Sequence, residues 1–358
     1  MSNFILRNHS CRIREITING LRAVILENEL LRVGILVDKG TDIFEFLYKP
    51  KDTDCMWQSW LGIRANNDWH STSPPKHGSF IDYYFGGWQE LFPNTDEACE
   101  YKGAELGIHG EVCLLPWDFQ IIQDFPEIIK VKFFVKTIRT PYFLEKTITL
   151  KSKSPVLEFD EKITNLSNEK MDFMWGFHPA LGEPFLSEEC HIILPSCRVR
   201  SDAILGFDHS RISFDHDNQW PHIPSTNENL IDLRKVPSKV TNSNDRVYIY
   251  DFNEGWYIVE NQKTKIAFSM SWDKEIFPYI LYWQSFGGWY GYPFYGTAYT
   301  ISLEPRSSFP FPLSRVIENN TQKKLDPKAS IKTHYTASLT HLEGNADYVN
   351  SNGKIFEK

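Results

Sequence analysis

The sequence lacks a long apolar run, a cluster of basic residues and closely spaced cysteines, and each absence excludes a class of protein. No stretch approaches the roughly 18 apolar residues of a membrane-spanning helix, and the first twenty residues contain no signal-peptide core. We therefore expect no membrane partner and a cytoplasmic location. The net charge is −8 and no Lys/Arg stripe is present, so we expect no nucleic-acid partner.

Cofactor motifs are also missing. There is no P-loop, no G-x-G-x-x-G that opens a helix and no G-x-S-x-G elbow. Residues 207–222 hold His209, His216 and His222, but their spacing matches no known metal motif, so we expect neither a metal nor an organic cofactor. The six scattered cysteines form no C-x-x-C pair and are expected to be free thiols, namely Cys11, Cys55, Cys99, Cys113, Cys190 and Cys197.

Aromatic residues and short alternating segments are abundant. The 25 Phe, 16 Tyr and 11 Trp suit pleated sheets or a ligand cleft lined with flat rings. No long amphipathic helix stands out. Residue patterns predict strands at 21–28, 30–37, 41–48, 127–138, 142–150, 155–166, 246–251, 255–260, 265–272, 297–304 and 330–342.

This rhythm predicts an all-β fold, a large antiparallel β-sandwich forming a single domain over residues 1–343. Residues 62–112 are rich in Gly, Pro, Trp and His, and residues 195–245 in Pro, Asp, Asn and His. Both irregular segments are expected to form long loops around a concave cleft. Residues 344–358 are predicted to be a weakly anchored C-terminal tail. The oligomeric state is expected to be a monomer or homodimer.

The segment DFMWGFHP presents His178 at the end of a predicted strand. Alternation places His178 on the face opposite Phe177, and Pro179 is expected to end the ladder of hydrogen bonds. His178 is either a catalytic group or a structural histidine beside a loop. Glu183, five residues along, is the nearest carboxylate.

A second predicted strand end has the same design. In TAYTISLEP, Glu304 shares one face with Thr300 and Ser302, and Pro305 is expected to terminate the strand. A carboxylate beside small polar residues suits the floor of a ligand cleft, although a solvated surface Glu is the plainer alternative.

A third candidate is His109 in ELGIHGEV, where flanking glycines allow a sharp bend. Upstream, FGGWQELFPN combines a flat ring with hydrogen-bonding groups, a mixture that suits a polyol-binding pocket. Its candidate substrate-binding residues are Trp88, Gln89, Glu90 and Asn94.

Taken in order, GIHGEV, GFHPAL and SLEPRSSFP resemble the motifs of the aldose 1-epimerase family, also called galactose mutarotases. The resemblance spans roughly residues 20–340. It implies a small-molecule sugar substrate and a reaction that interconverts the α and β anomers of a free sugar. In that mechanism Glu304 is the general base on the C1 hydroxyl, His178 is the general acid on the ring oxygen, and His109 stabilises charge there.

The chain also departs from the family. Members that act on galactose or glucose commonly carry arginines around the His-Gly motif and His-Pro-Tyr-Phe-Asn at the second histidine, whereas this chain has HPALG. Asp245 is the best match to a sugar-binding aspartate of the family, with Asp251 as a competitor. Arg306 is a candidate for contact with the substrate or for a salt bridge.

Two other functions compete with anomerisation. A glycoside hydrolase would need a second carboxylate about 5–10 Å from Glu304, for which Glu90 and Glu111 are the candidates. A non-catalytic sugar-binding or sensing module would keep the cleft without the reaction.

Overall fold

The computed structural model describes residues 7–65, 80–201 and 208–358. Within these residues nearly all regular structure is strand, in two large antiparallel sheets, which confirms the predicted β-sandwich. The two described helices have four and six residues, so neither is long enough to cross a membrane.

The larger sheet has twelve strands. Its order is β1-β2-β3-β4-β6-β14-β24-β23-β20-β16-β17, and the short strand β5 also pairs with β4, outside this order. Its strands are β1 (Arg12–Ile18), β2 (Leu21–Glu27), β3 (Leu31–Leu36), β4 (Asp42–Tyr48), β5 (Thr53–Asp54), β6 (Trp88–Leu91), β14 (Gly176–Leu181), β16 (Arg198–Ser201), β17 (Asp217–Gln219), β20 (Ser243–Tyr250), β23 (Tyr279–Phe286) and β24 (Tyr299–Arg306).

The second sheet has eight strands in the order β15-β21-β22-β26-β12-β11-β10-β9. They are β9 (Asp118–Phe125), β10 (Ile128–Lys136), β11 (Tyr142–Lys151), β12 (Val156–Asn165), β15 (Cys190–Ile193), β21 (Trp256–Asn261), β22 (Ile266–Trp272) and β26 (Ser330–His341). The remaining elements are α1 (Phe80–Tyr83), α2 (Leu313–Glu318), η1 (Lys49–Lys51), η2 (Lys239–Thr241), and the two-stranded pairs β7 (Cys99–Tyr101) with β8 (Ala104–Leu106), β13 (Met171–Phe173) with β25 (Lys323–Leu325), β18 (His222–Pro224) with β19 (Leu230–Asp232), and β27 (Ala346–Val349) with β28 (Ile355–Glu357).

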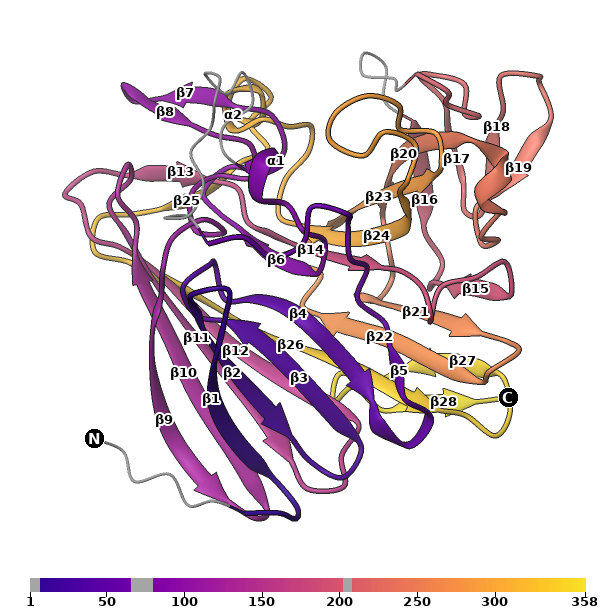
Figure 1. Ribbon diagram of the computed structural model, residues 1–358. Helices are drawn as coiled ribbons and strands as arrows, with labels where there is room; N and C mark the ends of the chain where they lie inside the picture. The colour runs from indigo at the N-terminus through magenta and orange to yellow at the C-terminus, as the bar shows by residue number, and fades with distance from the viewer. Residues whose placement is uncertain (1–6, 66–79, 202–207) are drawn as a thin grey trace.

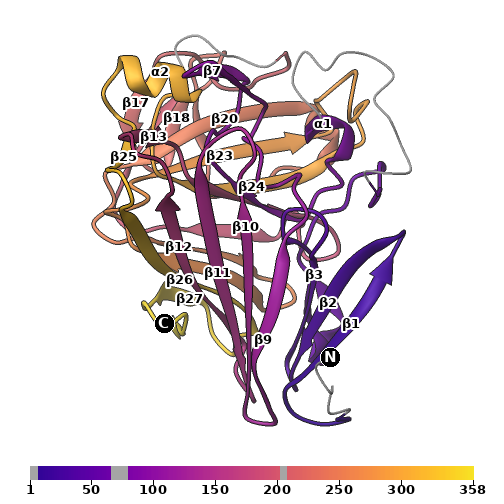
Figure 2. The same cartoon turned by 90° about the vertical axis from the view of Figure 1, so that its left-hand side faces the viewer.

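The two sheets lie face to face around one aromatic core. Figure 2 shows β1–β3 on one side and β9–β12 on the other, with α1, α2 and β7 above them. Phe46 of β4 contacts Phe268 of β22 with ring centroids 5.9 Å apart, and Phe177 of β14 contacts Tyr335 of β26 at 4.3 Å. Alternation explains this packing, because in β10 every second residue from Ile129 to Val135 is buried.

Both prolines expected to end strands lie inside them. β14 continues past Pro179 to Leu181, and β24 continues through Pro305 to Arg306. The paired positions between the two strands fall on either side of Pro179, and Ser302 Oγ donates a hydrogen bond to the Pro179 carbonyl at 2.9 Å. A side chain thus supplies a contact where the ladder is interrupted, which places His178 in the middle of the sheet.

The C-terminal tail is a second correction. Residues 346–357 form the hairpin of β27 and β28, visible beside β21 and β22 in Figure 1. Ala346 and Val349 are buried against Trp256 and Ile258, and the Ala346 amide donates to Glu260 Oε2 at 3.2 Å. Apolar contact with the second sheet therefore anchors this segment.

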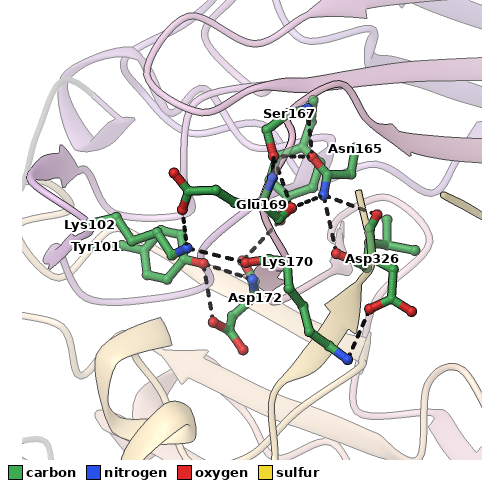
Figure 3. A network of polar contacts seen from close by, with 10 residues as sticks. Tyr101, Lys102, Asn165, Ser167, Glu169, Lys170, Asp172 and Asp326 are labelled. Atoms are coloured by element: carbon green, nitrogen blue, oxygen red, sulfur yellow. Dashed lines mark hydrogen bonds and ion pairs between the residues drawn. The ribbon is translucent and has the colours of Figure 1, made fainter. Parts of the chain in front are cut away.

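A polar network fixes the approach to β14 (Figure 3). The Asn165 amide group donates to the carbonyls of Glu169, Leu325 and Asp326, closing the turn between β12 and β13. Tyr101 Oη donates to Asp172 Oδ2 at 3.1 Å and accepts from the Asp172 amide at 2.8 Å. The Tyr101 bonds tie β13, which ends five residues before His178, to the β7–β8 hairpin, and the Asn165 bonds tie the end of β12 to the end of β25.

A buried ionic cluster lies between the sheets. Lys146 Nζ of β11 is 2.7 Å from Glu90 Oε2 of β6 and 3.7 Å from Glu161 Oε1 of β12. Tyr335 Oη donates to Glu161 Oε1 at 2.6 Å. Burial, reinforced by the charge of Glu90, raises the pKa of Glu161 well above its ordinary value, and the closest ion pair of Lys146 is with Glu90.

Replacing Lys146 with methionine is expected to lower the free energy of unfolding by about 3–5 kcal/mol, because Glu90 is left as an uncompensated buried charge. Urea unfolding followed by circular dichroism measures the change. Lys136→Met, at an exposed position of β10, is the matched control and should change stability by less than about 0.5 kcal/mol. Equal stability of the two variants would contradict the account of the cluster.

Candidate active site

His178 and Glu304 face each other on the middle strands of the larger sheet. Gly176 pairs with Arg306 and Ala180 with Ser302, a register that sets His178 opposite Glu304. His178 Nε2 lies 3.3 Å from Glu304 Oε1, and the two residues are 5% and 1% exposed. The structure thus brings together two predicted groups that are more than a hundred residues apart in the chain.

Arg306 joins this pair to a second carboxylate. Its Nη2 atom donates to Glu304 Oε2, and its Nη1 atom lies 3.1 Å from Asp96 Oδ2. Because Arg306 is only 2% exposed, its positive charge must be compensated within the protein, by Asp96 and by its hydrogen bond to the Glu304 carboxyl group.

His109 enters the site from the loop after β8. The ring centroids of His109 and His178 are 5.3 Å apart. Asp96 N donates to His109 Nδ1 at 3.0 Å, and His109 N donates to the Asp96 carbonyl at 3.0 Å. Gly110 lets the loop approach β6, since a Cβ atom there would lie 2.3 Å from the Phe92 carbonyl oxygen.

Aromatic side chains cover the two histidines. Phe80 of α1 contacts the His109 ring edge-on at 4.4 Å and stacks on Tyr84 at 5.0 Å. Tyr84 Oη lies 3.3 Å from His178 Nδ1. On the other side, the Trp283 ring lies 5.9 Å from that of His178. These rings exclude water and lower the effective dielectric around the charged groups.

Burial shifts the pKa values of His178 and Glu304 in opposite directions. Burial raises the pKa of Glu304 to about 8, although the adjacent Arg306 opposes that rise. Burial, together with the positive charge of Arg306, lowers the pKa of His178 to about 3. Between these values the His178–Glu304 pair holds one transferable proton.

Of the predicted residues on β6, only Gln89 lies on the face of His178. It pairs with His178 across the strands, and its Nε2 atom donates to Asp42 Oδ2 and the Gly86 carbonyl. Trp88 instead packs in the core 5.3 Å from Phe159, and Glu90 accepts a hydrogen bond from Trp175 Nε1. A strand exposes alternate residues to opposite faces, so Trp88 and Glu90 cannot share the face of Gln89.

Two other predicted residues, Asn94 and Asp245, lie away from the pair. The Asn94 side chain holds its loop in place by donating hydrogen bonds to the Glu97 and Gly107 carbonyls. Asp245 is paired through Gln284 with Ile301, which places it on the sheet face opposite Glu304, and its Oδ2 atom is 2.6 Å from Arg211 Nε.

The two remaining candidates, Asp251 and Glu183, are not part of the buried site. Asp251 is exposed just after β20, and Glu183 is exposed in the loop after β14.

Motif reasoning missed Tyr84, Phe80 and Asp96. The pair Gly86-Gly87 after Tyr84 signals a bend, and Asp96 follows a Phe-Pro-Asn turn, but neither pattern indicates a partner far along the chain. Their roles depend on how loops fold over the sheet, which local sequence does not specify.

A family model described as a domain of unknown function (DUF4432) matches residues 18–339. The chain belongs to the DUF4432 family. No curated protein matches its sequence.

Solved structures share the fold of this DUF4432 protein at low sequence identity. One, a Klebsiella pneumoniae protein provisionally described as an aldose 1-epimerase, is 14% identical with a TM-score of 0.71, covering 92% of this chain and 83% of that one. A galactose mutarotase-like protein from Clostridium acetobutylicum is 14% identical with a TM-score of 0.61, covering 93% and 99%. A galactose mutarotase related enzyme from Lactobacillus acidophilus is 18% identical with a TM-score of 0.59, covering 89% and 97%. The fold is therefore the galactose mutarotase-like β-sandwich that the motifs implied.

Replacing Asp96 with asparagine is expected to lower the pKa of Glu304. The negative charge of Asp96 raises that pKa, and its loss also leaves the charge of Arg306 free to act on Glu304. A pH titration of the Glu304 carboxyl carbon by ¹³C NMR measures the shift, with Glu304→Gln identifying the resonance. Asp251→Asn is the control, and a Glu304 pKa that rises or stays constant in Asp96→Asn would contradict the assignment.

Proposed function

We propose that this protein is a sugar 1-epimerase that interconverts the α and β anomers of a free aldose. The observation that carries the proposal is the approach of His178 Nε2 to Glu304 Oε1, 3.3 Å apart on adjacent buried strands. Anomerisation moves only protons and requires one proton donor and one acceptor near the C1–O5 bond. A buried imidazole and a buried carboxylate supply these two groups.

The reaction divides into ring opening and ring closure. Glu304 takes the proton from the C1 hydroxyl while His178 delivers a proton to O5, and the C1–O5 bond breaks. The resulting aldehyde turns about the C1–C2 bond, and the C5 hydroxyl adds to its other face. Both proton transfers then run in reverse, so each group returns to its starting state.

The single proton shared by the pair fits this cycle. Ring opening leaves that proton on Glu304 and leaves His178 neutral, which is the state that the raised and lowered pKa values favour in the empty site. The empty site is thus matched to the open-chain sugar. Ring opening of the closed sugar starts with the proton on His178. The hydroxyl groups of the bound sugar must therefore bring the pKa values of His178 and Glu304 closer together.

Access to the pair requires a movement of the covering ring. Phe80 contacts His109 and Tyr84, and both catalytic candidates are almost inaccessible behind these side chains. Tyr84 is held more firmly, because its carbonyl accepts a hydrogen bond from Ser59 Oγ at 3.0 Å and Ser59 N donates to the next carbonyl along the chain. Phe80 is therefore the side chain that a sugar would displace.

The hydrolase alternative finds less support. Glu90 is engaged with Trp175 and Lys146 between the sheets, and Glu111 accepts hydrogen bonds from the amides of residues 138–140. Neither is available as the second carboxylate of a glycosidase. A binding-only protein would use the same residues to hold a sugar, and activity measurements separate it from an enzyme.

Glu304→Gln and His178→Ala are each expected to reduce the catalysed rate of mutarotation by about 10²–10⁴-fold, since each removes one positioned proton transfer. Polarimetry of freshly dissolved α-sugars measures the rate across hexoses, pentoses, 6-deoxy sugars and phosphorylated sugars. The matched controls, Glu183→Gln and His222→Ala, alter exposed residues and should retain full activity. Binding of a sugar without any acceleration by the wild-type protein would support the binding-only alternative.

The pH dependence follows from the transferable proton. As pH rises through about 8, Glu304 loses that proton and the pair no longer holds a donor. After subtraction of the uncatalysed rate, kcat/KM should be level near neutrality and fall about tenfold per pH unit at higher pH. A kcat/KM that increases as pH rises through 8 would show that the carboxylate alone limits the reaction.

A further inference from the structure

Two loops are clamped together beside the His178–Glu304 pair. Asp96 and His109 exchange hydrogen bonds in both directions, from Asp96 N to His109 Nδ1 and from His109 N to the Asp96 carbonyl, each 3.0 Å long. Both residues have positive φ values, 60° and 61°, a region that residues other than glycine rarely adopt. Such strain persists only where the surroundings impose it, and it concentrates at functional sites.

The hydrogen bond from Asp96 N determines which ring nitrogen of His109 carries hydrogen. A backbone N–H can only donate, so Nδ1 must present its lone pair to Asp96. The hydrogen of the neutral ring is then on Nε2. Protonating His109 would place a second N–H against the Asp96 amide, breaking the bond and opposing two donors.

The charges around His109 also favour the neutral form of its ring. Its ring is buried and faces His178 of β14 and Arg306 of β24, both of which disfavour a positive charge on His109. The carboxylate of Asp96 is turned to Arg306, while the Asp96 backbone meets the imidazole.

We propose that the Asp96 backbone locks His109 permanently as the neutral Nε2–H tautomer, so that the ring can only donate a hydrogen bond into the site. Asp96 is thereby a positioning residue for two groups. Its backbone orients His109, and its carboxylate orients Arg306 against Glu304. The catalytic part of this inference rests on the proposed epimerase function, whereas the tautomer does not.

The tautomer is tested on the free protein by ¹⁵N NMR of the histidine rings. We expect His109 to show a protonated Nε2, a bare Nδ1 and a coupling across the hydrogen bond between Asp96 N and His109 Nδ1. These signals should stay unchanged over roughly pH 5–8, the range in which an ordinary histidine titrates. A protonated Nδ1, or a His109 that titrates in this range, would overturn the proposal whatever the protein catalyses.

The role in catalysis is tested by replacements that keep or remove an N–H donor. His109→Ala should lower kcat by about 10²–10³-fold, the usual cost of losing one donor to a developing negative charge. His109→Gln keeps a side-chain N–H and should recover much of that loss, while His178→Gln should be as inactive as His178→Ala. Both His109 variants share the same backbone strain, so thermal unfolding of the two checks that they are equally folded.

Equal inactivity of His109→Gln and His109→Ala would overturn the donor role. The tautomer measurement is unaffected by that result. If the wild-type protein accelerates no anomerisation, the epimerase proposal fails and the NMR result still decides whether His109 is locked.

Discussion

The register between β14 and β24 sets His178 opposite Glu304 in a space that almost no water reaches. A buried carboxylate is costly unless a cation or a proton accompanies it. Here Arg306, two residues further along β24, bonds the carboxylate directly, and Asp96 balances the guanidinium from a loop. The chemistry available to the site follows from this arrangement of one guanidinium, two carboxyl groups and one imidazole.

β6 separates two buried polar systems. Gln89 faces His178 and bonds Asp42, while the neighbouring Glu90 faces Lys146 between the sheets. The alternation of one strand therefore couples the site to the core, and a change in the position of β6 would disturb both. Replacing buried ion pairs by apolar residues is often neutral or stabilising, so these charges are better explained by specificity or function than by stability.

The alternation of apolar and polar residues and short apolar runs made most strands of the two large sheets predictable from sequence. β23, in which seven of eight residues are buried, was not predicted, whereas the fully buried β21, β22 and β24 were. The prolines misled at positions 179 and 305, where interruption of the ladder or a missing N–H is tolerated inside the sheet. The C-terminal hairpin was missed because Ala346 and Val349 find their partners in distant strands.

The site was only partly predictable, because several of its residues find their partners in distant parts of the chain. Short motifs identified His109, His178 and Glu304, because the residues around them carry glycine and proline signals. The same motifs also named Trp88 and Asp245, which the register places on the sheet face opposite Glu304, and register cannot be read from proximity in sequence. Asp96 and Tyr84 act through a backbone amide and through loop packing, neither of which leaves a sequence pattern.

The central claim is that His178 and Glu304 exchange protons with the anomeric centre of a sugar. Two-dimensional NMR exchange spectroscopy on equilibrated aldoses tests it most directly, because it records α-to-β conversion without any change in bulk composition. The account predicts protein-dependent cross-peaks between the two anomeric protons of at least one sugar, which disappear in the Glu304→Gln protein. Absence of such cross-peaks with the wild-type protein across the whole panel of sugars would contradict it.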